Sequence, residues 1–216
     1  MKEVIVNRKK NIKVCCCVIQ FEKKILILLF IGSLPLIIVG FIFFNNSPRN
    51  VTAKFLNKVT TINFKKTRPV CVFVNPSEAD VYQAISFFEN PILQFHGNET
   101  KDFCESFGFD YWKAIHMESA ASLEQIDNYD SADALLLETY KADIVGGTGE
   151  AFDWSYITTD VLANNNIVLS GGINLKNVDN ALKIKPWCLD INSGVESEPG
   201  IKDITLINTM VNKITS

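Results

Sequence analysis

The chain is poor in histidine, in paired cysteines and in excess positive charge. It has two histidines, His96 and His116, and six cysteines, none of them in a C-x-x-C pair, so we expect no zinc or other metal site. Lys and Arg number 21 against 24 Asp and Glu, which leaves a net charge of −3. This balance lacks the basic stripe typical of nucleic-acid binding, and we predict no nucleic-acid partner.

One uncharged run is long enough to be a membrane anchor. Residues 25–44 read ILILLFIGSLPLIIVGFIFF, and a helix rising about 1.5 Å per residue would span the hydrocarbon core over that length. The run starts too late and is too long for a signal peptide. Cysteine usage favours a reducing, cytoplasmic compartment, and a form anchored in the membrane through 25–44 is the alternative.

From residue 70 onward, short apolar runs alternate with helical patterns. The runs are continuous rather than alternating, as in parallel strands that are covered on both sides. The first helix is predicted to begin with Asn75 as its N-cap and Pro76 at its first position. Strands are predicted at 70–74, 91–95, 111–116, 133–138, 166–170 and 187–191, and helices at 75–88, 99–107, 122–126, 154–161, 174–183 and 204–214.

Two further strands are predicted upstream, at 11–19 and 39–44, with a helix over 51–62. Eight strands and, if part of the segment 23–35 is helical, eight helices predict a single-domain (β/α)8 TIM barrel. The barrel would span 11–216 after an N-terminal extension at 1–10, with an irregular first β-α unit.

Two glycine-bearing turns follow the last two predicted strands. LSGGIN and INSGVE come after strands 7 and 8, where barrels of this kind usually bind phosphate. Glycine lets backbone N–H groups approach an anion closely. We therefore predict a phosphate site made by Gly171, Gly172, Ser193 and Gly194, with ordinary tight turns as the alternative.

Candidate acid, base and anchoring groups lie at other strand ends. Glu138 ends strand 6, and partial burial at the barrel mouth is expected to raise the pKa of its carboxyl. Cys15 in strand 1 is a candidate base. Arg49, just after strand 2, either grips an anion with two parallel bonds or is a solvated loop cation. His96 either lines the site or has a structural role.

Six motifs in order resemble the phosphoribosylanthranilate isomerase family of tryptophan biosynthesis. They are SPRNV, VFVNPS, LQFHGNE, GGTGEAFDW, LSGGINLKNV and LDINSGVESEPGIKD, and the resemblance runs from about Gly40 to the C-terminus. It implies a cofactor-free (β/α)8 barrel that acts on a small phosphosugar as a monomer or a homodimer. The implied reaction is the Amadori rearrangement of N-(5'-phosphoribosyl)anthranilate to 1-(2-carboxyphenylamino)-1-deoxyribulose 5-phosphate.

The resemblance also implies roles for single residues. Cys15 matches the general base that removes the C2 proton of the ribose, with Cys17 as second choice. Glu138 stands where the family has an aspartate that protonates the ring oxygen. Arg49 matches the arginine that pairs with the anthranilate carboxylate, and Asp190 matches an aspartate that contacts the substrate.

The chain departs from the family pattern in two places. Glu138 is one methylene longer than the family's aspartate, from which we expect reduced but not absent activity. Lys13, Val14 and Cys15 keep the start of the family motif, but the pattern is lost over 16–39. A shifted reading frame over that segment is one hypothesis, and a catalytically impaired sugar-phosphate-binding barrel is an alternative function.

Overall fold

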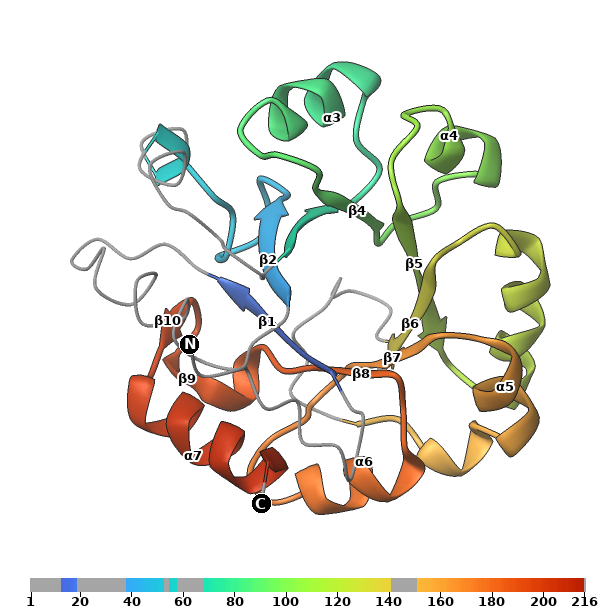
Figure 1. Cartoon of the computed structure of the whole chain (residues 1–216), viewed down its shortest axis with the longest axis vertical. Helices are drawn as coiled ribbons and strands as arrows, with labels where there is room; N and C mark the ends of the chain where they lie inside the picture. Colours follow the sequence, from blue (N-terminus) through green and yellow to red (C-terminus); the bar gives the residue numbers. More distant parts are fainter. Residues whose placement is uncertain (1–12, 19–37, 53–54, 58–67, 141–150, 216) are drawn as a thin grey trace, which may run out of the picture.

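The computed structural model describes residues 13–18, 38–52, 55–57, 68–140 and 151–215. Eight parallel strands close into a barrel in sequence order, with β8 pairing to β1, which confirms the predicted (β/α)8 architecture (Figure 1). The strands are β1 (Lys13–Val18), β2 (Ile38–Phe43), β3 (Arg68–Phe73), β4 (Ile92–Phe95), β5 (Tyr111–Met117), β6 (Ala134–Thr139), β7 (Ile167–Leu169) and β8 (Cys188–Asp190).

Helices surround the barrel, and several are shorter than the sequence predicts (Figure 1). The predicted helix over 154–161 is two pieces, because the Thr158 hydroxyl accepts the N–H of Val161 and starts a new helix. Of the predicted helix over 51–62, residues 51–52 and 55–57 are described, and 55–57 are helical while 51–52 are not. The helices are α3 (Glu78–Ile85), α4 (Lys101–Glu105), η1 (Ala120–Tyr129), η2 (Trp154–Tyr156), α5 (Thr159–Asn164), α6 (Val178–Ile184), η3 (Ser193–Val195) and α7 (Ile204–Thr215), and a hairpin of β9 (Glu196–Glu198) and β10 (Ile201–Lys202) follows η3.

The prediction that Asn75 caps α3 is wrong. The cap is Ser77, whose hydroxyl accepts the N–H of Asp80 at 3.2 Å while the Asp80 carboxylate accepts the N–H of Ser77 at 3.0 Å. This reciprocal pair satisfies two backbone donors at the helix start. Asn75 has a left-handed φ of 46°, and its side chain accepts the N–H of Asn98.

Side chains alternate between the two faces of the barrel wall. On β6, Ala134 and Leu136 join the interior cluster, while Leu135 and Leu137 pack into the outer layer beneath the helices. A strand has a side-chain period of two, so the next interior position is Glu138. The same parity therefore places a carboxyl group at the carboxyl end of the barrel interior.

The last part of the long apolar run is a barrel strand. Ile38–Phe43 forms β2, which pairs with β1 and with β3 in parallel register. A single helix over 25–44 is therefore wrong, and residues 25–37 of that run lie outside the described residues. Within the described ranges, no helix combines the length and apolarity needed to cross a bilayer.

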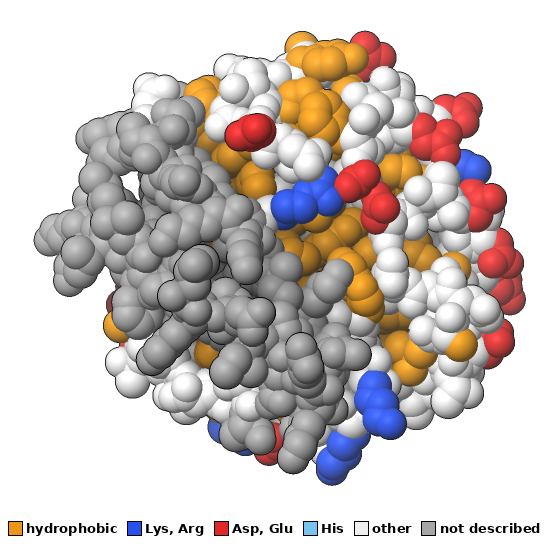
Figure 2. Space-filling model, in the orientation of Figure 1, with side chains coloured by type: hydrophobic (Ala, Val, Ile, Leu, Met, Phe, Trp, Pro, Cys, Tyr) orange, Lys and Arg blue, Asp and Glu red, His pale blue; other side chains and the backbone are white. Residues whose placement is uncertain are grey.

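Acidic side chains gather along one edge of the molecule. Figure 2 shows them from α3 through α4 toward α5, and the described part of this face has no continuous basic stripe. The surface visible there agrees with the net charge of −3.

Candidate active site

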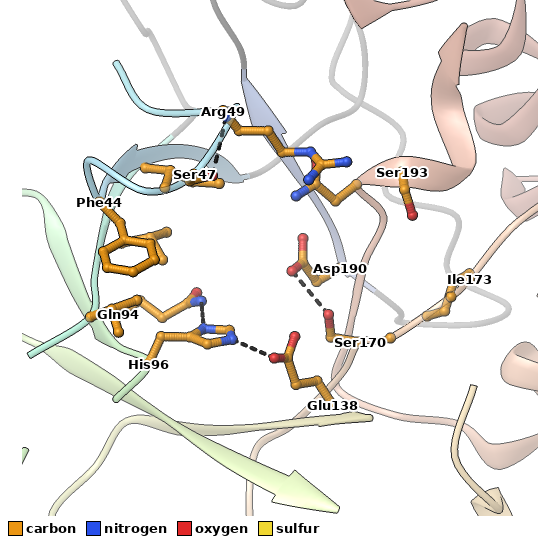
Figure 3. Close-up of a pocket in the computed structure, with 16 residues that line it drawn as sticks. Phe44, Ser47, Arg49, Gln94, His96, Glu138, Ser170, Ile173, Asp190 and Ser193 are labelled. Atoms are coloured by element: carbon orange, nitrogen blue, oxygen red, sulfur yellow. Dashed lines mark hydrogen bonds and ion pairs between the residues drawn. The ribbon is translucent and has the colours of Figure 1, made fainter. Parts of the chain in front are cut away.

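A pocket opens at the carboxyl ends of the strands (Figure 3). The predicted site residues Arg49, His96, Glu138 and Asp190 all line it, together with the turn that carries Gly171 and Gly172, and with Ser193. Apolar side chains form part of its wall, namely Ile42, Phe44, Val72, Val74 and Ile173. The pocket thus combines charged groups with a surface suited to an aromatic ring.

The two glycine turns meet at one side of this pocket. Gly171 and Gly172 have left-handed φ values of 84° and 63°, which glycine adopts without steric cost. Gly194 is not among the lining residues and instead lets the two turns touch. A Cβ built on Gly194 would lie 1.9 Å from the carbonyl oxygen of Ile173.

Arg49 is buried and paired, so the alternative of a solvated loop cation is wrong. Its Nε and Nη2 donate to the two carboxylate oxygens of Glu196 at 3.0 and 2.7 Å. Lys202 donates to the same carboxylate at 3.2 Å. Burial alone would raise the pKa of Glu196, but these two cations hold it below its usual range. Arg49 is therefore fixed in orientation at the pocket wall.

Glu138 ends a chain of polar side chains across the pocket floor (Figure 3). His96 Nε2 lies 2.7 Å from Glu138 Oε1, and His96 Nδ1 lies 3.0 Å from the Gln94 amide nitrogen. His116 Nδ1 approaches the same Glu138 oxygen at 3.5 Å. The expectation of a raised pKa for Glu138 is wrong. Burial acts in that direction, but the two imidazoles outweigh it and the pKa falls to about 2.

Asp190 has the opposite electrostatic character. Its carboxyl is buried, which raises its pKa to about 6, and the charge of Glu138 adds to the shift while Lys202 and His96 oppose it. Ser170 Oγ donates to Asp190 Oδ2 at 3.2 Å. The pocket thus holds two carboxyl groups whose environments push their pKa values in opposite directions.

The candidate base lies on β1, whose side chains are outside the described part of the structure. Its backbone register pairs Cys15 with Asp190 on one side and with Ile38 on the other, while Cys17 pairs with Gly40. Cys15 therefore occupies the same level of the barrel as a residue that lines the pocket. Its role as a base, and the choice between Cys15 and Cys17, stay predictions.

Gln94, Ser170 and Glu196 were not among the predicted site residues, although Ser170 and Glu196 follow strands whose ends were expected to form the site. Gln94 precedes His96 by two positions, and strand parity alone would have placed both on the interior face. Ser170 had a signal in the LSGG turn, and Glu196 had one in the SGVE motif. Their partners could not be predicted, because Arg49 and Glu196 are 147 positions apart in the chain.

Comparison with known proteins identifies relatives along almost the whole chain. The family model described as N-(5'phosphoribosyl)anthranilate (PRA) isomerase matches residues 19–213. The N-(5'-phosphoribosyl)anthranilate isomerase of Leptothrix cholodnii is 40% identical over 171 residues, which cover 78% of this chain and 76% of that protein.

Solved structures agree with the sequence comparison. The crystal structure of phosphoribosyl anthranilate isomerase from Thermotoga maritima has a TM-score of 0.82 at 27% identity, covering 94% of this chain and 98% of that one. A phosphoribosyl anthranilate isomerase in complex with reduced 1-(o-carboxyphenylamino)-1-deoxyribulose 5-phosphate has a TM-score of 0.79 at 27% identity, with the same coverage of 94% and 98%. The fold, the family model and the relatives all agree, and the chain belongs to the N-(5'-phosphoribosyl)anthranilate isomerase family.

Proposed function

We propose that this chain isomerises N-(5'-phosphoribosyl)anthranilate to 1-(2-carboxyphenylamino)-1-deoxyribulose 5-phosphate without a cofactor. One observation carries the proposal. The mouth of a barrel of this family gathers a fixed arginine, two carboxyl groups and two glycine turns around one pocket. These groups suit the three parts of the substrate: the glycine turns its phosphate, the carboxyl groups its sugar, and the arginine its aromatic carboxylate.

The pocket suggests how the substrate is held. Its phosphate would lie at the backbone N–H groups of Gly171, Gly172 and Ser193, while Gly194 lets the two turns approach each other. Its carboxylate would meet Arg49, whose guanidinium is held in position by Glu196. This arrangement sets the ribose between the two ends, over the floor that Glu138 and Asp190 line.

The chemistry needs one acid and one base on either side of the sugar. We assign Glu138 as the acid that protonates the ring oxygen, which breaks the bond between C1 and that oxygen. As that bond breaks, the lone pair of the anilino nitrogen would form a C=N bond to C1. Cys15, as a thiolate, would then take the proton from C2, and the resulting enolamine would become the ketone on protonation of C1. Since Glu138 is held as an anion, the proton would come from the imidazolium of His96, whose pKa is raised, and pass through the Glu138 carboxylate across their 2.7 Å contact, which leaves His96 neutral. His96 therefore supplies the proton that Glu138 passes to the ring oxygen.

Turnover by the purified full chain tests this function, followed through anthranilate fluorescence. We expect measurable turnover, and a loss of about 100-fold or more in kcat for Glu138→Gln. The matched control is Glu118→Gln, which removes an exposed carboxylate just beyond β5. Glu138→Asp restores the family's acid, and no gain in kcat would mean that the longer side chain already works.

The impaired sugar-phosphate-binding barrel gives a different result in the same assay. Such a barrel would bind a phosphosugar but show no turnover. Binding would be detected as quenching of the protein's tryptophan fluorescence or as protection of the protein from unfolding in urea. Peptide mass mapping across 10–45 tests the shifted-frame hypothesis directly, since peptides that match the written residues would disprove it. We further propose a cytoplasmic location, and a monomer and a homodimer are both compatible with this site.

A further inference from the structure

His96, His116 and Glu138 come from three neighbouring strands and form one cluster. His96 directly follows β4, His116 lies on β5 and Glu138 on β6. Their ligand-type atoms all lie within 4.8 Å of one another. His116 and Glu138 are in-register partners on adjacent strands, so the barrel wall itself sets their separation.

The hydrogen bonds of His116 leave a lone pair directed at Glu138. His116 Nε2 lies 3.0 Å from the backbone carbonyl oxygen of His96, and a carbonyl can only accept, so Nε2 carries a hydrogen. In neutral His116 the other nitrogen, Nδ1, is then bare. That atom sits 3.5 Å from Glu138 Oε1, which is an anionic oxygen. A cation between these two atoms removes the repulsion, and it is either the proton that makes His116 an imidazolium or a metal ion that takes its place.

The second nitrogen of His116 already has the partner expected for a metal ligand, and that of His96 gains one when the Gln94 amide is rotated. Histidines that bind metals usually donate their other N–H to a carbonyl or carboxylate, which fixes the ring. His116 does so to the carbonyl of His96. His96 Nδ1 contacts the Gln94 amide at 3.0 Å, and a rotated amide would offer its oxygen to that N–H.

We propose that His96, His116 and Glu138 form a binding site for a zinc-like transition-metal dication at the floor of the pocket. Two imidazoles and one carboxylate are a ligand set that suits such ions, with an open position for water. The sequence predicted no metal site because it has only two histidines and no C-x-x-C pair. The fold brings them together across three strands.

Two of the three ligand separations are close to those that a zinc ion needs, and the third lies within 4.8 Å. Zinc bonds of about 2.0–2.1 Å in a tetrahedron separate the ligand atoms by about 3.3 Å. The contact from His96 Nε2 to Glu138 Oε1 must therefore widen from 2.7 Å, while the contact from His116 Nδ1 to the same oxygen, at 3.5 Å, barely changes. His116 keeps 28% of its side chain exposed, which leaves a route for the ion.

Occupancy of this site would inhibit the isomerase. The ion would take the carboxylate of Glu138 and displace the proton shared with His96. This second part rests on the proposed function, whereas metal binding does not.

Binding is tested with Co²⁺ and Zn²⁺ on the purified full chain, by calorimetry and by Co²⁺ absorption. We expect one site without the charge-transfer band that thiolate ligands give, and a loss of affinity of about tenfold or more for His116→Phe. Glu118→Gln is the matched control and should bind as the parent does. A Co²⁺ spectrum of thiolate type, or unchanged affinity in His116→Phe, would overturn the proposal.

A measurement without mutation guards against a variant that fails to fold. The chain has two histidines, so histidine-selective labelling gives two sets of imidazole NMR signals. Both sets must shift together on addition of Zn²⁺, and a shift of neither or of one alone contradicts the site. In the activity arm, Zn²⁺ should lower turnover of the parent more than that of His116→Phe. If the parent shows no turnover, the proposed function fails while calorimetry and NMR still decide the metal site.

Discussion

Replacing Asp190 by asparagine should stabilise the protein at neutral pH. Burial is the main reason that the pKa of Asp190 rises from 3.8 to about 6, so the folded protein holds this proton more tightly than the unfolded chain does. The stability that the protonated carboxyl contributes is present below about pH 4 and is lost as the pH rises through about 6. A shift of about 2 pH units corresponds to about 3 kcal/mol.

Asparagine has nearly the same shape and carries no charge, so it avoids that cost. Asp190→Asn should raise the free energy of unfolding by up to about 3 kcal/mol near pH 8, and by close to zero near pH 4. Its turnover should fall, because the residue lines the proposed site, as expected where stability is given up for function.

Urea unfolding of both proteins near pH 4 and near pH 8 measures this difference. Comparing the two proteins at each pH cancels the other titrating groups, which they share. Ser170 Oγ donates to this carboxylate and can donate equally to the asparagine oxygen, so that bond is retained. A destabilised variant near pH 8, or a stability difference that does not change with pH, would refute the argument.

Three other substitutions test separate parts of the structure. Lys113 Nζ lies 3.3 Å from Glu99 Oε2, and Lys113→Met leaves that buried carboxylate without its cation. The free energy of unfolding measured in urea should fall by about 3–5 kcal/mol, and a change below about 1 kcal/mol would contradict this. Arg49→Lys loses the two-bond geometry with Glu196 and should raise KM about tenfold with a smaller change in kcat, so an unchanged KM would show that this arginine does not bind substrate. Gly171→Ala forces a side chain onto a φ of 84° and should cost about 1–2 kcal/mol in thermal unfolding and raise KM, whereas wild-type values for both would exclude a constraint at this turn.

The barrel itself could be predicted because its strands have a local signature. Each strand is a short apolar run, since helices cover one side and the packed interior the other, and this holds for β3 through β8 without reference to any distant residue. The position of the site could also be predicted from the sequence. Strand ends of a barrel meet at one mouth, so Glu138, His96 and Asp190 could be grouped before any contact was known.

The misses occur where two local signals compete or where distant groups meet. Asn75 and Ser77 both have capping side chains, and the reciprocal bond between Ser77 and Asp80 decided between them. The pKa of Glu138 falls rather than rises because two histidines approach it from neighbouring strands. Neither outcome can be read from spacing alone.

By itself, the sequence determined the order of strands and helices, the end of the barrel that carries the site, and the positions of the two glycine-bearing turns. These follow from hydrophobic period and glycine placement, which act over a few residues. The tertiary structure decided which charges meet. Closure of the barrel pairs Arg49 with Glu196 and brings both histidines to Glu138. Because these groups are buried or half-buried, the charge and the pKa of each depend on the partner that lies next to it in space.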